Sequence, residues 1–327
     1  MRAVVCTRLD GPDALVIDDV EEPTPSLGEV TVRVEAAALN FADLLMSRGQ
    51  YQEKPTLPFV PGFEVAGRIE QVCPGVTELA VGDRIMGVVD HGAFAEVARV
   101  RAVDAVPIGE TMDAGAAAGF PIAYGTAHGA LAWRANLQEG ETLLVHGAAG
   151  GVGLTAVEIG RAMGARVIAT ARGADRLAVA KARGAEAIID STAEDVRERV
   201  MDLTDGRGVD VCFDPVGGDL GSTSLRCLAW SGRYLVIGFA KGDVPDIKPN
   251  HLLVKNTAAI GFYWGSYRQH DPARLRASLH TLLEWHGRDA LQPLVGGRYP
   301  LADFRPALAT LESRRSTGKV VLEIAKE

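Results

Sequence analysis

The sequence predicts an α/β protein in which a parallel sheet with helices on both faces is joined to a second, β-rich domain. Segments of strand and helix character alternate from about Ala114 to Trp264, which is typical of a parallel sheet built from right-handed crossovers. Before Ala114, short apolar runs are separated by glycine and proline turns. At 327 residues the chain is long enough for two hydrophobic cores.

The β-rich region is expected to form a partly closed barrel. Its strands are predicted in the runs EVTVRVEAAAL, FEVAGRIEQV, DRIMGVV and FAEVARV, with turns at 61–62, 74–75 and 82–83. The last sixty residues read as a helix, an irregular YPLADF, another helix and a closing strand GKVVLEI, too short a tail for a separate domain. We therefore expect residues 1–118 and 266–327 to form one domain and residues 119–265 the other.

In the second region a helix is expected from Ala114 to about Asn136, and strands and helices then alternate. The predicted strands are TLLVHG, RVIATA, AIID, VDVCFDP and RYLVIGF, and AAIGFYW is expected to be the last strand of the sheet. Between the first two strands we expect a helix from about Val152 to Met163, and after RVIATA a helix ending near Arg183.

Net charge, cysteine spacing and hydropathy argue against nucleic-acid binding, a disulfide framework and a membrane span. A net charge of −8 argues against a nucleic-acid surface. The four cysteines are scattered without a C-x-x-C pair, which favours reduced thiols in a cytoplasmic protein. Residues 114–133 carry no Asp, Glu, Lys or Arg, but they are rich in Ala and Gly and contain Pro121, so no membrane span is predicted. A small-molecule substrate is the expected partner.

The stretch HGAAGGVG, residues 146–153, follows a predicted strand and opens a predicted helix. In that context glycines let the backbone approach a pyrophosphate, and the helix N-terminus supplies free N–H groups. Ala148 replaces the first glycine of a strict G-x-G-x-x-G, which a slightly wider turn would tolerate. We expect the cofactor phosphates to lie against Ala149, Gly150, Gly151 and Val152. His146, at the end of the strand, is interpreted as a packing or hydrogen-bonding residue.

The tip of the next strand selects the cofactor. An NAD site places Asp or Glu there to hold the ribose 2′-OH, whereas Thr170, Ala171 and Arg172 stand at this position. Arg172 and Arg176 are four residues apart, so both are expected to reach a 2′-phosphate, and Thr170 borders the same ligand. The sequence therefore predicts NADPH rather than NADH. Two solvated arginines would be the alternative interpretation.

Several motifs together resemble a known family. The glycine loop, ALNFADLLMSRGQY, PFVPGFEVAGRIEQV, VGDRIMG, GAFAE and TGKVVL are similar, in order, to the medium-chain dehydrogenase/reductase superfamily. Within it, the chain resembles the zinc-free NADPH:quinone oxidoreductases, and PNHLLVKN with GFYWG resembles their quinone-oxidoreductase-like branch. The resemblance implies a Rossmann domain that binds NADPH and a GroES-like barrel domain that binds substrate.

The resemblance also predicts that no metal is bound. Zinc alcohol dehydrogenases of the superfamily carry Gly-His-Glu where this chain has Gly62, Phe63 and Glu64, and their cysteine ligand is replaced in the stretch around Asn40 and Asp43. A catalytic zinc needs three protein ligands, and phenylalanine supplies none. Without a Lewis acid, hydride addition to an electron-poor quinone or activated double bond remains accessible.

The catalytic residues implied by the resemblance are Asn40, Asp43 and Tyr51. Related zinc-free enoyl-thioester reductases carry an Asn-Pro-Ser-Asp run and a Gly-x-Tyr whose tyrosine is taken as proton donor; here Phe41 and Ala42 replace the Pro and Ser. A phenol or amide donor would stabilise negative charge on a substrate oxygen. Asn40 and Asp43 are equally suited to cap a helix that begins near Phe41, and water is an alternative acid to Tyr51.

Further cofactor contacts are expected beyond the glycine loop. The resemblance places Tyr124 and Thr126 near the nicotinamide and phosphates, and Lys319 near the phosphates. Gly238 and Phe239 follow a strand whose carboxyl end faces the ligand in such sheets.

Three assignments stay open at this point. The first is hydride transfer to a quinone, and the second is hydride transfer to an enone, enal or enoyl-CoA. The third, from another class, is a catalytically weak NADPH-binding protein with a structural or RNA-associated role. Relatives pair through sheet edges, so a homodimer is expected, with the strand near 258–264 as the edge.

Overall fold

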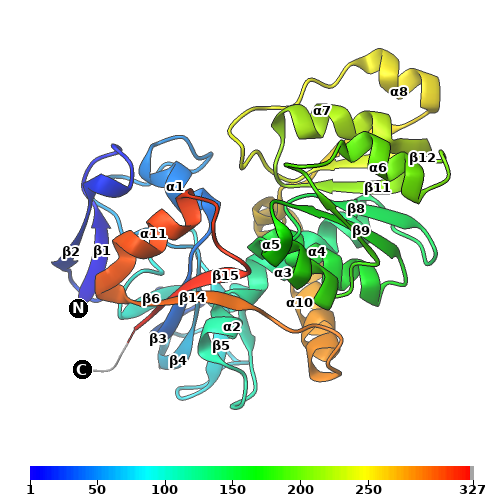
Figure 1. The fold of residues 1–327 in the computed structure, drawn as a ribbon. Coiled ribbons are helices and arrows are strands. Elements are labelled where there is room, and N and C mark those ends of the chain that lie inside the picture. Colours follow the sequence, from blue (N-terminus) through cyan, green and yellow to red (C-terminus); the bar gives the residue numbers. More distant parts are fainter. Residues whose placement is uncertain (325–327) are drawn as a thin grey trace. The chain divides into compact units, whose positions relative to one another are not determined.

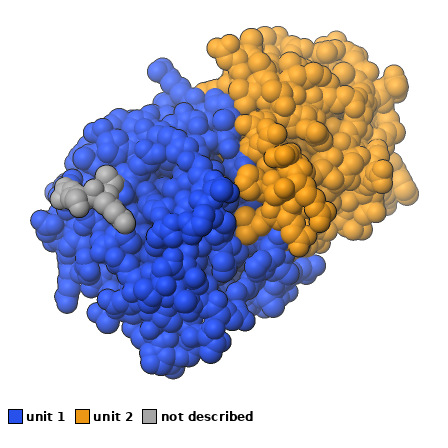
Figure 2. Space-filling model, turned by 90° about the horizontal axis from the view of Figure 1, so that it is seen from below, with its two compact units in different colours: residues 1–122, 268–280, 293–327 blue, residues 123–267, 281–292 orange. Residues whose placement is uncertain are grey.

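The computed structural model describes residues 1–324, which fold into two compact units (Figure 2). Unit 1 comprises residues 1–122, 268–280 and 293–327, and unit 2 comprises residues 123–267 and 281–292. Both expected domains are thus recognisable in outline. The main difference is that residues 281–292, expected with the barrel, belong to unit 2.

Unit 2 contains a parallel sheet with helices along the chain between its strands (Figure 1). Its strands are β8 (Thr142–Val145), β9 (Arg166–Ala171), β10 (Ala187–Asp190), β11 (Val209–Asp214), β12 (Leu228–Val236) and β13 (Ala258–Gly261). They lie in the order β10-β9-β8-β11-β12-β13, with each neighbouring pair parallel. This is the doubly wound order of dinucleotide-binding domains. The prediction that the 258–264 segment ends the sheet is confirmed.

The helices of unit 2 follow the expected alternation. They are α3 (Phe120–His128, whose first turn belongs to unit 1), α4 (Gly151–Ala162), α5 (Ala174–Ala182), α6 (Val196–Leu203), α7 (Gly218–Cys227) and α8 (Pro249–Lys255). The helix expected from Ala114 to Asn136 is instead three pieces, because Gly119 ends α2 (Ala114–Ala118) and a π-helical turn at Gly129–Arg134 follows α3. At Gly119 a Cβ would lie 2.9 Å from the Lys319 side chain, so the break accommodates close packing.

Unit 1 is built on a sheet that the C-terminal strands complete. Its strands are β1 (Arg2–Cys6), β2 (Leu15–Asp19), β3 (Glu29–Ala38), β4 (Glu64–Val72), β5 (Arg84–Val88), β6 (Val97–Arg101), β7 (Ala105–Pro107), β14 (Val295–Pro300) and β15 (Lys319–Glu323). The main sheet runs β14-β15-β3-β4-β5-β7, with β6 paired to β3. The helices are α1 (Phe41–Ser47), α9 (Tyr267–His270, shared with unit 2 at its first residue), α10 (Pro272–Gly287, shared with unit 2) and α11 (Phe304–Glu312).

The expected return of the tail is confirmed, since β15 pairs antiparallel with the C-terminal end of the barrel strand β3, at residues 36–38. One strand was missed. The segment VGGRYP forms β14 and pairs in parallel with β15; residues 295–298 have no predicted element, and Tyr299 and Pro300 fall in the stretch expected to be irregular.

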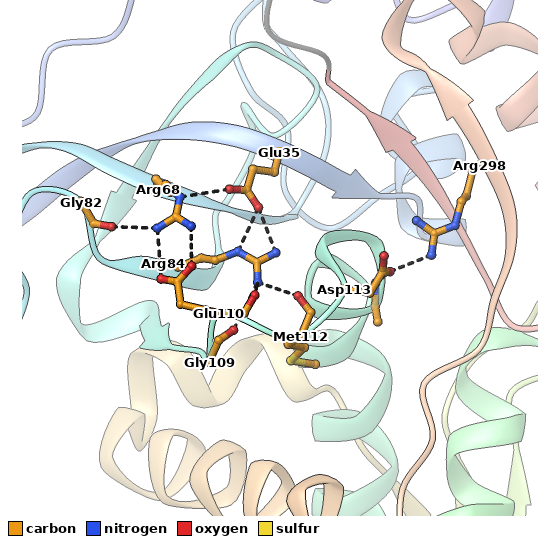
Figure 3. Close-up of polar contacts among 10 residues, drawn as sticks. Glu35, Arg68, Gly82, Arg84, Gly109, Glu110, Met112, Asp113 and Arg298 are labelled. Atoms are coloured by element: carbon orange, nitrogen blue, oxygen red, sulfur yellow. Dashed lines mark hydrogen bonds and ion pairs between the residues drawn. The ribbon is translucent and has the colours of Figure 1, made fainter.

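A polar network fixes the loop that follows β7 (Figure 3). The buried guanidinium of Arg84 donates to Glu35 Oε2 at 3.0 Å and to the carbonyl of Met112 at 2.5 Å. Arg68 pairs with Glu110 on the same loop. These contacts hold the segment that leads into α2. Within residues 1–324, the structure has no helix with the length and hydropathy that a membrane crossing requires.

Candidate functional site

The glycine loop of unit 2 connects β8 to α4, as the sequence predicts. Gly147 adopts a positive φ of 57°, and a Cβ on Gly153 would lie 2.2 Å from the carbonyl oxygen of Gly147, so only glycine allows the loop to fold back on the first helical turn. Gly150 is the N-cap of α4, and the nearest atom to a Cβ built on it is 3.4 Å away. The loop therefore leaves space beside Gly150 for a group that approaches the backbone.

Ala148 is tolerated because its methyl group points into the core. It is completely buried, and its N–H donates to the carbonyl of Thr170 at 2.9 Å. Ala149 packs with Ala171 and Leu177. The first turn of α4, beginning with Gly151 and Val152, leaves N–H groups without intrahelical acceptors, which is the arrangement that binds anions.

His146 joins two strands and a helix beneath the loop. It is completely buried; its Nδ1 lies 2.9 Å from Thr170 Oγ1 and its Nε2 lies 2.5 Å from Ser224 Oγ. Ser224 donates its own proton to Leu220 O, so we infer that His146 donates from Nε2 and accepts at Nδ1. Burial lowers the pKa of His146, which favours this neutral form. The interpretation of His146 as a hydrogen-bonding residue is confirmed.

The tip of β9 holds the residues expected to select the cofactor. The side chain of Thr170 is buried and directed to His146, so it does not offer its hydroxyl to a ligand; only its backbone lies at the tip. Arg172 directly follows β9 and is exposed, and Arg176 is half-buried in the first turn of α5. Gly173 caps α5 at φ 82°, and its N–H donates to Asp190 at 3.1 Å. Arg172 thus follows the strand directly and Arg176 lies in the helix that follows; that both reach a 2′-phosphate stays a prediction.

The other expected cofactor residues of unit 2 lie on α3 and after β12. Tyr124 is buried and donates to Glu158 Oε2 at 2.5 Å, and Glu158 also pairs with Arg183 at 2.8 Å. Burial raises the pKa of Glu158 and, together with the Glu158 charge, raises that of Tyr124. This hydroxyl is thus engaged inside the unit. Thr126 is also buried.

Gly238 and Phe239 come directly after the carboxyl end of β12. Phe239 is partly exposed, and its ring contacts the position where Gly217 would carry a Cβ, at 3.1 Å. Their place beyond the strand end agrees with where ligands lie in such sheets.

In unit 1 the sequence-predicted Asn40, Asp43 and Lys319 lie in one buried polar cluster. Asn40 is the N-cap of α1, and its backbone N–H donates to Asp43 Oδ2 at 2.7 Å, the capping arrangement that the sequence allows. Lys319 Nζ donates to Asn40 Oδ1 at 2.8 Å. Burial raises the pKa of Asp43 to about 7, and Lys319 opposes that shift.

The cluster contains one residue that sequence reasoning did not assign, Glu64. It is completely buried at the start of β4 and accepts from Lys319 Nζ at 2.8 Å, from Asn40 Nδ2 at 2.9 Å and from the backbone of Ile122 at 3.0 Å. The available signal was an acidic residue directly before the short apolar run Val65–Gly67. Lys319, expected near phosphates, directs its three donors to Glu64, Asn40 and the carbonyl of Leu39.

Tyr51 lies apart from these hydrogen bonds. It is half-buried, and its ring packs edge-on against Phe63, the residue at the zinc-ligand position, with 5.4 Å between centroids. Phe63 is buried in the barrel core. Among residues 1–324 no group of three His, Cys, Asp or Glu side chains is placed to hold a metal ion.

Comparison with known proteins agrees with this architecture. Residues 26–110 match the alcohol dehydrogenase GroES-like domain, and residues 151–284 match the zinc-binding dehydrogenase family. The chain is 41% identical over 326 residues to the quinone oxidoreductase-like protein 2 homolog of Nematostella vectensis, covering 98% of this chain and 88% of that protein. This chain belongs to the quinone oxidoreductase branch of the medium-chain dehydrogenase/reductase superfamily.

Solved structures of similar proteins extend the likeness over the whole fold. A mycobacterial protein complexed with NADPH superposes with a TM-score of 0.93 at 34% identity, covering 99% of this chain and 100% of that one. The quinone oxidoreductase of Thermus thermophilus, also solved with NADPH, gives a TM-score of 0.86 at 37% identity, covering 99% and 100% of the chains. The Rossmann and GroES-like architecture expected of the quinone oxidoreductase branch is thereby confirmed.

Proposed function

We propose that this protein is an NADPH-dependent oxidoreductase that reduces a quinone without a metal ion. The observation that carries the proposal is the glycine loop: it joins β8 to α4 in a sheet of dinucleotide-binding order, and Gly150 leaves its approach open. Its similarity to quinone oxidoreductases solved with NADPH supports the cofactor and the substrate class.

The residues of unit 2 fit NADPH. The N–H groups of the first turn of α4 suit the pyrophosphate, with Ala149, Gly150, Gly151 and Val152 forming the cradle. Bound there, the cofactor supplies a hydride to the substrate.

A 2′-phosphate fits the tip of β9. Arg172 and Arg176 offer planar donors suited to it, and no acidic residue occupies positions 170–172, where an NAD site carries one; the nearby carboxylate of Asp190 accepts from the N–H of Gly173 at 3.1 Å. Gly238, Phe239, Tyr124 and Thr126 are assigned to the nicotinamide half, where Tyr124 contributes its ring because its hydroxyl is held by Glu158.

Unit 1 supplies the polar groups for the substrate. Asn40 has N–H donors and Tyr51 a phenol, and either stabilises negative charge that develops on a quinone oxygen. Phe63 fills the place of a zinc ligand and is packed by Tyr51, which supports chemistry that needs no Lewis acid. Asp43 contributes to this site through its cap on Asn40 rather than by contact with substrate.

The second candidate substrate is an activated carbon–carbon double bond. The same donors would hold the carbonyl oxygen of an enone, enal or enoyl-CoA, and Tyr51 would protonate the resulting enolate. The observation in its favour is Tyr51 itself, a phenol whose ring packs edge-on against Phe63.

A matched pair of substrates tests the proposal. Oxidation of NADPH is measured with a simple para-quinone and with a short enoyl-CoA, with NADH as the control cofactor. Faster turnover of the quinone supports the proposal, and faster turnover of the thioester identifies an enoyl reductase. Tight NADPH binding without turnover of either would leave a catalytically weak binding protein.

We also propose a homodimer in the cytoplasm. Strand β13 ends the sheet with an open edge, and exposed Trp230, Leu253 and Val254 lie on β12 and α8, which pack together. The four free thiols are consistent with a reducing compartment. A monomer found by light scattering at micromolar protein concentration would overturn the proposal of a dimer.

A further inference from the structure

The buried cluster of unit 1 is assembled by the register of three strands. Ala38 of β3 pairs directly with Glu64 of β4 on one side and with Val321 of β15 on the other. Glu64 and Lys319 each begin their strand, and Asn40 follows the end of β3. The sheet therefore brings a carboxylate, an ammonium and a carboxamide to one end, although 279 residues separate Asn40 from Lys319.

The ion pair in this cluster is fully satisfied. Glu64 Oε1 accepts from Lys319 and from Asn40, and its Oε2 accepts from the backbone N–H of Ile122. The three protons of Lys319 go to Glu64, Asn40 and the carbonyl of Leu39, each at 2.8–2.9 Å. A buried ion pair of this kind is retained only when such hydrogen bonds compensate its desolvation.

The charges of Lys319 and Glu64 fix the orientation of the Asn40 side-chain amide. Its Oδ1 faces the ammonium of Lys319, and its Nδ2 faces the carboxylate of Glu64. A flip of the amide would place its NH2 against the cation and its oxygen against the anion, so both contacts would become repulsive. Hydrogen bonds to charged partners are stronger than those between neutral groups, so this orientation is held firmly.

One donor of Asn40 remains weakly used. The second proton on Nδ2 has only a long contact of 3.4 Å with the carbonyl of Ala38. The amide orientation thus leaves an N–H, rather than a carbonyl oxygen, as the group that a substrate meets.

We propose that Glu64 and Lys319 are positioning residues that lock the Asn40 amide as a hydrogen-bond donor, and so restrict the substrate to one with an acceptor oxygen, such as a quinone or enone carbonyl. This inference rests on the proposed function for its substrate class. It also assigns Lys319 to Asn40 and Glu64, in place of a cofactor phosphate.

The amide itself reports on the proposal without any turnover. The chain has four asparagines, Asn40, Asn136, Asn250 and Asn256, so protein labelled with 15N-asparagine gives four side-chain NH2 pairs. We expect the Asn40 pair to exchange with solvent most slowly. Exchange should accelerate by roughly tenfold or more in Glu64→Gln and Lys319→Met, because the charge-assisted bonds that hold the amide are lost.

Two further variants keep the test decisive. The double variant Glu64→Gln/Lys319→Met leaves no lone buried charge, so it answers the question if a single variant fails to fold. Glu70→Gln is the matched control: it makes the same substitution on β4, at a half-exposed pair with Arg33, and should leave the Asn40 exchange unchanged.

Kinetics separates positioning from phosphate binding. We expect kcat with the para-quinone to fall roughly tenfold to a hundredfold in the cluster variants, while the Kd for NADPH changes by no more than about twofold. Unchanged exchange of the Asn40 amide would overturn the proposal. A tenfold or larger weakening of NADPH binding with kcat preserved would overturn it as well, and would identify Lys319 as a phosphate ligand. If the wild type reduces no quinone, the exchange and NADPH-binding results still decide the positioning role.

Discussion

The carboxyl group of Asp43 makes the stability of unit 1 depend on pH in an unusual direction. The group is buried, one of its oxygens has no hydrogen-bond partner among the described residues, and burial raises its pKa from 3.8 to about 7. The facing charges are Lys319, which lowers the pKa, and Glu64, which raises it. Because the folded state holds this proton more tightly than the unfolded chain, the stability that Asp43 contributes is fully present below pH 3.8 and is lost as pH rises through about 7.

The Asp43→Asn variant isolates this effect because asparagine does not titrate. A shift of about three pKa units corresponds to about 4 kcal/mol in total, of which about 3 kcal/mol falls between pH 5 and pH 8. The unfolding free energy of the wild type minus that of the variant should therefore decrease by this amount over that range. Asparagine retains an oxygen that accepts from the Asn40 N–H, so the cap on α1 is preserved.

Urea unfolding at pH 5, 6, 7 and 8 measures the difference, with an internal control in the chain. The tryptophans, Trp133, Trp230, Trp264 and Trp285, all belong to unit 2, whereas circular dichroism reports on both units. If the units unfold separately, the pH effect should appear in the dichroism and be absent from the fluorescence. A difference between wild type and variant that stays constant from pH 5 to pH 8 would refute the reasoning, as would a 13C titration that shows no aspartate near neutrality.

Three further predictions concern unit 2. Arg172→Ala combined with Arg176→Ala should raise the KM for NADPH far more than the KM for NADH. Each charged hydrogen bond that is lost should cost about 1.5–3 kcal/mol of binding free energy. An equal rise in KM for both cofactors would mean that the 2′-phosphate lies elsewhere. Gly150→Ala should weaken NADPH binding in titrations without lowering Tm, because its Cβ meets no protein atom closer than 3.4 Å. Gly153→Ala should lower Tm as well, because its Cβ would lie 2.2 Å from a backbone oxygen. An unchanged Kd for NADPH in Gly150→Ala would contradict the proposed pyrophosphate site. His146→Leu removes the partner of the buried Thr170 hydroxyl and the donor to Ser224, which keeps its own bond to Leu220 O. This variant should destabilise unit 2 by about 1–3 kcal/mol in urea unfolding followed by tryptophan fluorescence, and an unchanged midpoint would refute this.

The parts of the fold that follow from local pattern were predicted from the sequence. The alternation of apolar strands and helices predicted the parallel sheet, because the central strands β8, β9 and β11 bury their own apolar residues. The terminal strand β13 has no fully buried residue and was recognised from its apolar run alone. Strand β14 was missed because its two glycines and its final proline have no strand preference, and its extended form depends on pairing with β15, which is distant from it in the sequence. The break at Gly119 was missed for a related reason: it depends on the side chain of Lys319, which is distant in the sequence.

The site divides in the same way. The glycine loop and the arginines after β9 are contiguous in sequence, so their spacing already describes their geometry. The inward turn of Thr170 depends on His146, a residue on the neighbouring strand. Glu64 was not assigned because its partners are chosen by the register of β4 against β3 and of β3 against β15. A one-residue slip of β4 against β3 would move Glu64 to the other face of the sheet, and a slip of β15 against β3 would do the same to Lys319.

That register also explains why a phenylalanine and a glutamate stand side by side at positions 63 and 64. Phe63 packs with Tyr51 in the barrel core, while Glu64 is buried against Lys319 and Asn40. The carboxylate therefore has a compensating cation supplied by the chain itself, and its burial does not require a metal ion nearby. The same Lys319 ammonium also donates to the oxygen of the Asn40 amide. It therefore both neutralises the buried Glu64 carboxylate and leaves the Asn40 N–H directed to the substrate. Replacement of Lys319 by a neutral residue should consequently disturb both, whereas the glycine loop in unit 2 should retain its affinity for NADPH.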